Sequence, residues 1–469
     1  MIIMINNAED HPYYWQIYRQ IRERIISGKL TEGSKLHSTR MLAKDLKIAR
    51  NTVERAYLQL WSEGYIVANK SRSKFVVQAL DNILYANETV QKIENNQRLP
   101  DNTPAIKYDF QYGKMMASDF PLYLWRRISN KCLAPPFAEK MTYYNEHQGE
   151  QDLQVAIREY LYKSRNVVCQ PNQIVICSGI HSCLGLLSQL FRDHTTDVAV
   201  EDPGYDGARN VFKNNGYRVF PVGLRDSGID RKKLERSRAK IVYVTPSHQF
   251  PTGSIMPIQK RFDLLDWAVR TNGIVIEDDY DSELRYNSRP IPSMQGIDRN
   301  NSVVYTGTFS KVLSPALRLS FFVLPKPWLE VFQIKFKNYH SSVPWLQQKV
   351  LQQFMSLGYW DSHLRKICLA NKKKHDLLVK TIHELMGNHV IIHGRNAGLH
   401  IMLEINNGLT EDELINRACK YGVAVYPVSK YWMRPKQYTN NMVLIGFSGI
   451  NEKDIIKGIR NLYHSWFCE

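Results

Sequence analysis

The sequence predicts an α/β protein with two domains: a small helical domain that ends in a β-hairpin, and a large body built on a mainly parallel sheet. Three observations support this class. The chain has 469 residues, which is more than one ordinary core accommodates. Residues 11–79 carry three helical patterns followed by two short apolar strands. From Tyr108 onward, apolar strands alternate with helical patterns. We therefore expect domains at 11–79 and 108–469, joined by a polar, proline-containing linker at 80–107.

The composition is that of a globular protein without a membrane span or a disulfide framework. Hydrophobic residues make up 43% of the chain and charged residues 23%, which is typical of this class. The seven cysteines are scattered with no CxxC pair, which indicates reduced thiols and argues against structural zinc. The first residues, MIIMINNAED, lack the features of a signal peptide, and no apolar run approaches spanning length. We therefore expect a cytoplasmic protein without a structural metal.

The positive charge of the chain is densest at its N-terminus. The formal net charge is +17, and the first 80 residues hold 13 Lys and Arg against 7 Asp and Glu. This distribution is typical of a nucleic-acid-binding domain. A generic basic surface is one alternative. A DNA-packaging protein is another, although the basic segment is small and resembles a motif.

The basic N-terminal domain is predicted to begin with three amphipathic helices. The first spans His11 to Ser27. Ser38 is a suitable N-cap for the second, Thr39 to Leu46, and the third runs from Arg50 to Glu63 before Gly64. The inward residues expected for these helices are Tyr14, Tyr18, Ile21, Ile25, Met41, Leu42, Leu46, Val53, Tyr57 and Leu60.

Polar and basic residues gather at the start of the third helix, away from its apolar stripe. A recognition helix presents such residues to the major groove of DNA. Two short strands follow, around Tyr65–Val67 and Lys74–Val77, with a basic turn between them. Three helices and a hairpin are the layout of a winged helix-turn-helix. A helical dimerisation domain is the alternative.

This segment, LHSTRMLAKDLKIARNTVERAYLQLWSEGYI, resembles the GntR family of regulators. The resemblance implies binding to double-stranded operator DNA. The family's wing tip is usually rich in glycine, whereas here it reads Ser71 to Lys74 and carries added positive charge. The DNA contacts implied by the resemblance are Ser38, Arg40, Arg50, Asn51, Thr52 and Arg55, with Arg72 and Lys74 on the wing.

A lysine and several phosphate-binding groups occur together in the stretch TGTFSKVLSPALR, residues 306–318. The amine of Lys311 can form a Schiff base with an aldehyde. Hydroxyls at Thr308 and Ser310 and the guanidinium of Arg318 can hold a phosphate by charge-assisted hydrogen bonds. Surface loops often contain Ser-Lys pairs, so this stretch alone leaves an unrelated surface lysine as the alternative.

A second stretch, IVIEDDYDSE at residues 274–283, is an apolar strand that ends in acids. Ligands of open α/β sheets bind beyond the carboxyl ends of strands. Asp278 there could pair with a protonated pyridine nitrogen, and Tyr280 could donate to a phenolic oxygen. An Asp-x-Tyr followed about thirty residues later by Ser-Lys and an arginine resembles pyridoxal-phosphate (PLP) enzymes of the aspartate-aminotransferase fold. The resemblance implies that Lys311 is the Schiff-base lysine and Asp278 the pyridinium partner.

Three further turns match the same fold. Strand Ile174–Ile176 is followed by a glycine turn at the start of a helix. The free backbone N–H groups of such a turn are suited to bind a phosphate. By resemblance, this turn binds the PLP phosphate. The tyrosine of EDPGY would stack on the ring; a core tyrosine is the alternative. The loop TPSHQFPTG would face the ring oxygen. Phe250 in this loop stands where many aminotransferases have Asn. The residues concerned are Ser178, Gly179, Ile180, His181, Tyr205, His248 and Gln249.

The whole chain from residue 11 to about 465 resembles the MocR/GabR subfamily of GntR regulators, in which a winged helix-turn-helix precedes a fold-type I PLP-dependent aminotransferase-like domain. The signatures are RNTVERAY, EDPGY, TPSHQFPTG, EDDYDSE and TGTFSKVLSPALR. The resemblance implies a PLP-binding transcriptional regulator that forms a head-to-tail homodimer.

The residues that would clamp an amino-acid effector depart from the GABA-responsive members of the subfamily. Those members have an arginine where this chain has Gly207 and another where it has Lys430. Lysine lacks the planar fork that binds a carboxylate bidentately. This favours a PdxR-like regulator of vitamin B6 synthesis that senses PLP itself, with Lys430 as an effector contact. A regulator of another amino compound and a working aminotransferase remain as alternatives.

Overall fold

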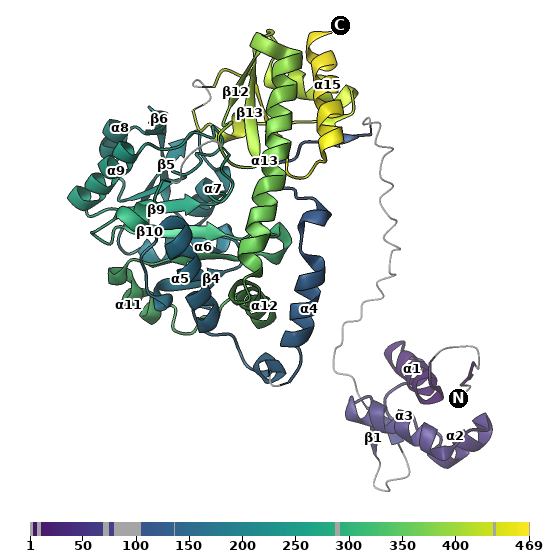
Figure 1. Cartoon of the computed structure of the whole chain (residues 1–469). Helices are drawn as coiled ribbons and strands as arrows, with labels where there is room; N and C mark the ends of the chain where they lie inside the picture. Colours follow the sequence, from purple (N-terminus) through teal and green to yellow (C-terminus); the bar gives the residue numbers. More distant parts are fainter. Residues whose placement is uncertain are drawn as a thin grey trace. The chain divides into compact units, whose positions relative to one another are not determined.

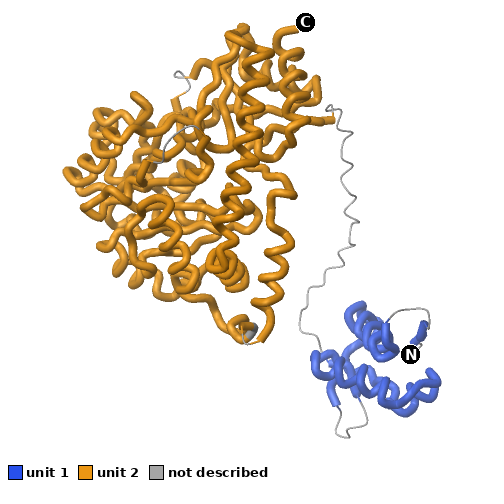
Figure 2. Tube along the Cα trace, viewed as in Figure 1, with its two compact units in different colours: residues 1–101 blue, residues 102–469 orange. Residues whose placement is uncertain are grey.

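A computed structural model of the chain describes residues 3–6, 11–68, 75–78, 105–135, 137–286, 291–434 and 438–468. It divides into two compact units, residues 1–101 and 102–469 (Figure 2). The predicted linker lies almost wholly outside the described residues. In the described part of the chain, no helix combines the length and the apolarity that crossing a bilayer requires.

The first unit is a three-helix domain with a hairpin, as predicted. Its elements are α1 (Tyr13–Ile26), α2 (Thr39–Leu46), α3 (Arg50–Ser62), β1 (Ile66–Ala68) and β2 (Phe75–Val77). The hairpin is antiparallel and pairs Ile66 with Val77. The side chain of Ser38 caps α2, because its hydroxyl accepts a hydrogen bond from the Met41 N–H at 3.2 Å.

The core of this unit forms around α3, whose Val53, Ala56, Tyr57 and Leu60 are fully buried. One inward residue was predicted wrongly: Met41 is 54% exposed, and Ala43 is buried in its place. The apolar stripe of α2 runs through positions 42, 43 and 46, so position 41 turns toward solvent.

The second unit contains an eight-stranded sheet with helices on both faces (Figure 1). The strand order is β4-β11-β10-β9-β8-β5-β6-β7, and β11 and β7 are the antiparallel members. The strands are β4 (Ile174–Cys177), β5 (Asp197–Asp202), β6 (Arg218–Arg225), β7 (Gly228–Ile229), β8 (Ile241–Val244), β9 (Ile274–Asp279), β10 (Val303–Thr308) and β11 (Ser320–Val323).

Alternate residues of these strands enter different cores, which is why the strands read as continuous apolar runs. On one face, Val175 of β4 packs with residues of α6, α7 and α11. On the other face, Ile174 and Ile176 pack with residues of α5 and α12, and Val242 and Val275 pack with residues of α8 and α9. The helices of this part are α4 (Leu122–Cys132), α5 (Gln151–Arg165), α6 (Ile180–Phe191), α7 (Asp206–Asn214), α8 (Arg231–Ser237), α9 (Ile258–Thr271), α10 (Met294–Ile297), α11 (Lys326–Lys335) and α12 (Trp345–Ser356).

A smaller four-stranded antiparallel sheet forms a separate core within the same unit. Its order is β12-β13-β16-β15, with strands at Val390–His393, His400–Ile405, Met442–Gly446 and Tyr426–Pro427. Three helices supply its apolar cover: α13 (Tyr359–Met386), α14 (Glu411–Lys420) and α15 (Glu452–Phe467). A short parallel pair, β3 (Tyr108–Asp109) with β14 (Val423–Ala424), ties the start of the unit to its C-terminal part.

Candidate functional site

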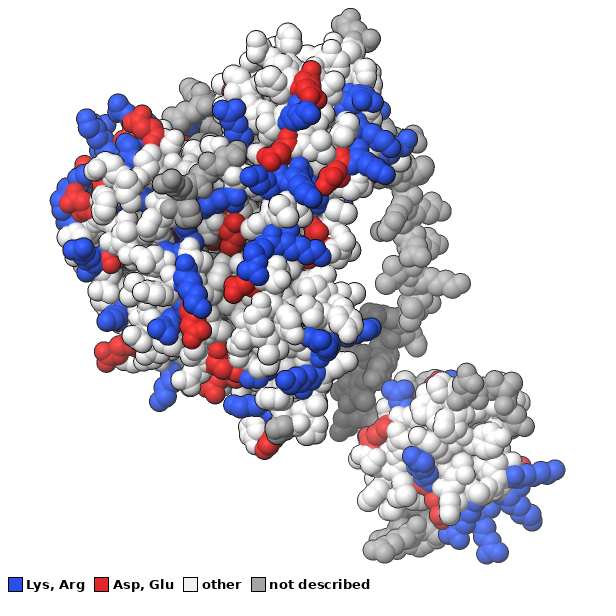
Figure 3. Space-filling model, viewed as in Figure 1, with Lys and Arg blue, Asp and Glu red and all other residues white. Residues whose placement is uncertain are grey.

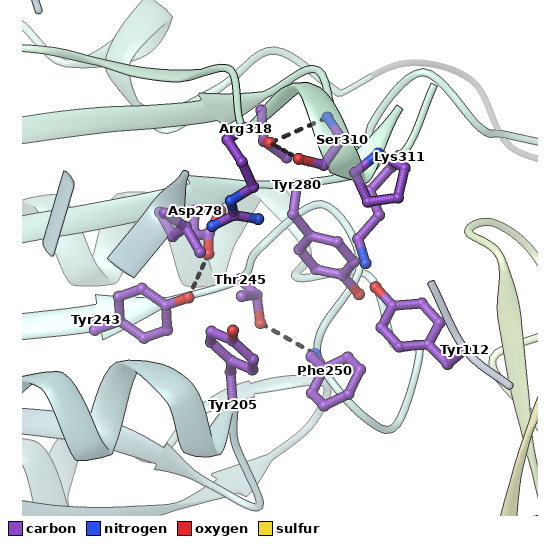
Figure 4. Close-up of a pocket in the computed structure, with 13 residues that line it drawn as sticks. Tyr112, Tyr205, Tyr243, Thr245, Phe250, Asp278, Tyr280, Ser310, Lys311 and Arg318 are labelled. Carbon is purple, nitrogen blue, oxygen red and sulfur yellow. Dashed lines mark hydrogen bonds between the residues drawn. The ribbon is translucent and has the colours of Figure 1, made fainter. Parts of the chain in front are cut away.

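A cavity of about 170 Å³ lies at the carboxyl edge of the large sheet (Figure 4). The strands β4, β5, β8, β9 and β10 are mutually parallel and deliver their following residues to this edge. It is also where the sequence places its polar strand-end motifs. The lining residues are Tyr112, Ile180, Tyr205, Tyr243, Thr245, Phe250, Asp278, Tyr280, Thr308, Ser310, Lys311, Pro315 and Arg318.

The amine of Lys311 enters this cavity from the turn after β10. Its Nζ lies 4.0 Å from the centroid of the Tyr112 ring, a cation–π distance. Burial lowers the pKa of Lys311 to about 8, although the carboxylates of Asp281 and Asp278 act in the opposite direction. A lysine with this pKa has a useful neutral fraction near pH 7, as a nucleophilic amine requires.

Asp278 is fully enclosed near the end of β9. The hydroxyl of Tyr243, on the neighbouring β8, donates to its carboxylate. Burial raises the pKa of Asp278 to about 7, and the nearby charge of Asp279 adds to the rise, while hydrogen bonds from Tyr243 and Thr306 oppose it. A carboxyl group with such a pKa can share a proton with a basic nitrogen placed against it. Tyr243 was not predicted, because it reads as a core residue of a buried strand.

The glycine turn after β4 and the arginine after β10 meet at one side of the cavity. Gly179 has φ +92°, and the Nη2 atom of Arg318 stands 2.0 Å from the position that a Cβ on Gly179 would take. Gly179 is the N-cap of α6 and provides no side-chain cap, so the first N–H groups of this helix remain for an anion. Arg318 also lies 3.5 Å from the carbonyl oxygen of Ser178.

Hydroxyl groups complete this side of the cavity. The Thr308 hydroxyl donates to the Ser310 hydroxyl at 3.0 Å and accepts from Ser320 at 2.8 Å. Ser178, a predicted cofactor contact, is not among the lining residues, and its hydroxyl accepts from Ser342 at 3.0 Å. Thr308, Ser310 and Arg318 therefore come together as the sequence predicted, next to the turn at Gly179.

Tyr205 and His181 form a pair at the cavity wall. The His181 Nε2 atom and the Tyr205 hydroxyl are 3.0 Å apart, and the two rings are inclined by 16°. The pair depends on Gly207, because a Cβ there would lie 2.4 Å from the Tyr205 ring and 2.7 Å from His181 Nε2. An arginine at 207 would therefore displace both rings. Tyr205 lines the cavity, whereas His181 is exposed to solvent and is not among the lining residues.

The structure corrects the expectation that His248 and Gln249 face a bound ring. Neither residue lines the cavity. The Gln249 amide donates to the carbonyl oxygens of Pro203 at 2.9 Å and Phe250 at 2.6 Å, and its oxygen accepts from Thr252. Gln249 thus holds the loop together. His248 lies behind Tyr280, and the loop presents Thr245 and Phe250 to the cavity instead.

Lys430 also lies outside the lining of the cavity. Its side chain is exposed, with Nζ 5.0 Å from the centroid of the Tyr431 ring. Its carbonyl oxygen accepts a hydrogen bond from Arg209 Nη2 at 3.0 Å. The described residues therefore do not place the Lys430 amine where it could bind a ligand beside Lys311, contrary to its predicted role.

The predicted DNA contacts lie at the starts of α2 and α3 in the first unit. Arg40, Arg50, Asn51 and Arg55 are exposed, whereas Thr52 is half-buried. The Arg50 guanidinium pairs with Glu54 at 2.7 Å, and Arg55 lies over the ring of Tyr14 at 4.2 Å. Ala49, the N-cap of α3, gives no side-chain cap, which leaves N–H groups at the helix start for a phosphate.

Figure 3 shows Lys and Arg side chains gathered on one side of this unit. The unit thus presents positive charge on the same small domain that carries the predicted recognition helix. Two of the predicted contacts, Arg72 and Lys74, lie outside the described residues.

Comparison with known families matches both units. Residues 13–76 match the family described as bacterial regulatory proteins, gntR family, and residues 138–436 match aminotransferase class I and II. The second match spans more than half of the chain. Together they bear out the predicted fold, a winged helix-turn-helix followed by a fold-type I aminotransferase domain.

Several curated proteins resemble the chain over its whole length. The HTH-type transcriptional regulator YdeL of Bacillus subtilis is 38% identical over 98% of both chains. The probable rhizopine catabolism regulatory protein MocR of Rhizobium meliloti is 30% identical, over 98% of this chain and 95% of that protein. The pyridoxine biosynthesis regulator PdxR of Corynebacterium glutamicum is 26% identical, over 97% and 96%.

Among solved structures, the kynurenine aminotransferase of Pyrococcus horikoshii superposes with a TM-score of 0.68 at 26% identity. The match covers 76% of this chain and 90% of that enzyme. It spans less of the chain than the curated regulators do.

Proposed function

The chain belongs to the MocR/GabR subfamily of GntR transcriptional regulators, with a DNA-binding helix-turn-helix and an aminotransferase-like domain, and we propose that it controls vitamin B6 synthesis genes in response to PLP. The observation that carries the proposal is the cavity at the sheet edge. It combines a reactive amine, a buried carboxyl group and an arginine seated in a glycine turn, while its remaining wall is largely aromatic.

The residues of the cavity fit a phosphorylated pyridine aldehyde. A bound PLP would supply an aldehyde carbon and an electron-withdrawing ring. Lys311 would hold the aldehyde carbon covalently, and Asp278 would pair with the ring nitrogen. The closeness of Arg318 to Gly179 supports a phosphate at the start of α6, where Ile180 can offer its backbone N–H. Tyr205 would lie against the ring and Tyr280 would donate to its phenolic oxygen.

The cavity provides little to bind an amino-acid carboxylate. Among the described lining residues, the cationic side chains are Lys311 and Arg318, and both have roles toward PLP in this proposal. Beside them lies an apolar cluster that contains Phe250, Val428 and Tyr431. This supports a regulator that senses the cofactor itself. The name of the relative PdxR, a pyridoxine biosynthesis regulator, supports the same proposal.

We also propose that the protein acts as a head-to-tail homodimer, as its resemblance to the subfamily implies. Exposed apolar side chains within residues 122–144 support a second copy as the partner, since exposed apolar surface marks interaction sites. Tyr143 and Tyr144 are 66% and 86% exposed, and Leu122 and Tyr123 are each 67% exposed. Light scattering on the purified chain tests the dimer, and a monomer at all concentrations would contradict it.

An operator-binding titration with PLP tests the proposed function. Operator DNA selected from random duplexes is titrated with full-length protein, with and without PLP, and in parallel with a panel of amino acids. We expect PLP alone to change the operator affinity. If PLP left the operator affinity unchanged and one amino acid altered it, that amino acid would be the effector in place of PLP. Rapid conversion of the loaded protein to its pyridoxamine form by an amino acid would instead favour an aminotransferase.

A further inference from the structure

A buried cluster behind Tyr280 contains two polar side chains that the proposed function leaves without a role. The Nδ1 atom of His248 lies 2.9 Å from the Asp281 carboxylate and 2.9 Å from the Tyr280 hydroxyl. His248 and Asp281 are each 1% exposed, and Tyr280 is the member of the cluster that lines the cavity. The cluster therefore runs from the protein interior to the Tyr280 hydroxyl, and Figure 4 shows that hydroxyl beside the Lys311 side chain.

The position of one proton in this cluster follows from the contacts. A carboxylate oxygen opposite an unprotonated Nδ1 would place lone pairs against each other, so the tautomer that satisfies this contact has the hydrogen on Nδ1 and donates it to Asp281. The Tyr280 oxygen near the same N–H can then only accept from it. The hydroxyl's own hydrogen must point elsewhere, and the side of Tyr280 away from His248 faces the cavity.

Close packing keeps the imidazole in this orientation. A Cβ on Gly398, which has φ +80°, would lie 2.1 Å from His248 Cε1 and 2.7 Å from the Asp281 carboxylate. A Cβ on Gly253 would lie 3.0 Å from His248 Nε2. Backbone thus approaches both edges of the ring, and the ring cannot turn without moving these loops.

The other titratable groups around the cluster do not replace His248 as the group that orients the Tyr280 hydroxyl. His400 of β13 has its ring centroid 5.1 Å from that of His248, and burial first, then His248, lowers the pKa of His400 well below its ordinary value. His400 therefore stays neutral. Burial raises the pKa of Tyr280 well above its ordinary range, so its hydroxyl keeps its proton. Tyr112, Asp278 and Lys311 face the cavity side of Tyr280.

We propose that Asp281 and His248 are positioning residues: Asp281 fixes the tautomer of His248, and His248 turns the Tyr280 hydroxyl so that it donates into the cavity. This inference rests on the proposed binding of PLP, whose phenolic oxygen would be the acceptor. A Tyr280 hydroxyl held in this orientation donates to the phenolic oxygen of PLP and stabilises its anionic form. Losing the donor makes the oxygen more basic, so the proton that it shares with the nitrogen of Lys311 is held more tightly.

Two substitutions at position 248 separate this role from simple packing. The amide nitrogen of Asn occupies nearly the place of Nδ1, whereas that of Gln occupies nearly the place of Nε2. In the full-length, PLP-loaded protein, H248Q is expected to raise the midpoint of the absorbance pH titration by about one pH unit, the size expected for one hydrogen bond to a charged group. H248N keeps the donor and is expected to titrate like the wild-type protein.

A double substitution tests whether the effect passes through Tyr280. Y280F alone is expected to raise the midpoint as H248Q does, and H248Q added to Y280F is expected to have no further effect. A wild-type midpoint in H248Q, or equal shifts in H248Q and H248N, would overturn the inference while leaving the proposed function intact. Protein that stays colourless with PLP would overturn both.

If H248Q does not fold, D281N replaces it, because an amide N–H facing Nδ1 favours the other tautomer. The shift that D281N causes in the midpoint of the absorbance pH titration must then differ between the wild-type and Y280F backgrounds. Equal shifts in the two backgrounds would mean that Asp281 acts on Lys311 by its charge alone, and would overturn the inference.

Discussion

The Arg318 guanidinium fills the space beside Gly179 in which any other residue would carry its side chain. Nη2 of Arg318 lies 2.0 Å from the Cβ position of Gly179, far inside a normal contact. The two residues are 139 positions apart: Gly179 follows the end of β4 by two residues, Arg318 precedes the start of β11 by two residues, and β4 and β11 are hydrogen-bonded neighbours. We propose that the absence of a side chain at 179 and the reach of an arginine from 318 belong to one anion-binding arrangement.

Substitution of Gly179 by alanine tests this arrangement. G179A is expected to weaken PLP binding about 10- to 100-fold, because the methyl group displaces the guanidinium and the backbone must adopt an unfavourable positive φ. PLP affinity is measured by absorbance titration. The matched control is G185A, within the helix that Gly179 precedes as N-cap, where an added Cβ meets no atom within 4 Å. Equal affinities for G179A and the wild type would mean that the phosphate is not held here.

Removal of the Lys311 amine is expected to separate cofactor binding from DNA binding. K311A should lack the absorbance band of the Schiff base and should show no adduct at position 311 after borohydride reduction, since alanine cannot bond the aldehyde carbon. The operator affinity without PLP should stay within about twofold, because Lys311 lies in the second compact unit and not in the helix-turn-helix. An intact PLP response of K311A in the operator titration would contradict the proposed link.

The rate at which Lys311 takes up PLP is expected to depend on pH in a defined window. Burial lowers the pKa of Lys311 to about 8, so about one amine in ten is neutral at pH 7, far more than for an ordinary exposed lysine. The uptake rate should fall nearly tenfold for each pH unit below about 7 and level off above about 8.5. Stopped-flow absorbance measures it. A rate that still rises tenfold between pH 9 and 10 would indicate an ordinary lysine pKa.

Several residues of the site were predictable from sequence, because each belongs to a short motif at the end of a strand or just after it. Lys311, Asp278 and Gly179 are of this kind, and the parallel sheet brings their strand ends to one edge. Tyr243 was not predictable. It is buried within β8, and its approach to Asp278 depends on the register that places Tyr243 opposite Ile276 of β9. Local sequence pattern does not specify that register.

Tyr112 and His248 illustrate two other limits. Tyr112 comes from the loop after β3, and its ring meets the Lys311 amine only because the chain folds back across 199 residues. His248 was predicted from its motif to face the cavity. The loop path instead turns it toward Asp281 and gives the cavity position to Phe250. Motifs thus predicted which loops meet at the site, whereas side-chain directions within those loops required the structure.

The start of α3 offers a test of DNA recognition that does not involve the cavity. R50A is expected to weaken operator binding by about 5- to 100-fold, as loss of one specific base or phosphate contact does. Glu54 pairs with Arg50 at 2.7 Å and competes with DNA for its guanidinium. E54Q should therefore strengthen binding slightly. Fluorescence anisotropy over a range of salt concentrations distinguishes a base contact from a phosphate contact. A lost phosphate contact lowers the slope of log affinity against log salt concentration by about one.

The control for R50A removes one exposed positive charge from the second unit. R236A, in α8, is expected to leave the operator affinity and its salt dependence unchanged. If R50A and R236A weakened binding equally, the net charge of the chain would explain the effect better than a recognition helix does. If R50A had no effect, DNA would require neither the Arg50 guanidinium nor its ion pair with Glu54, and the start of α3 would have to be oriented differently on the duplex.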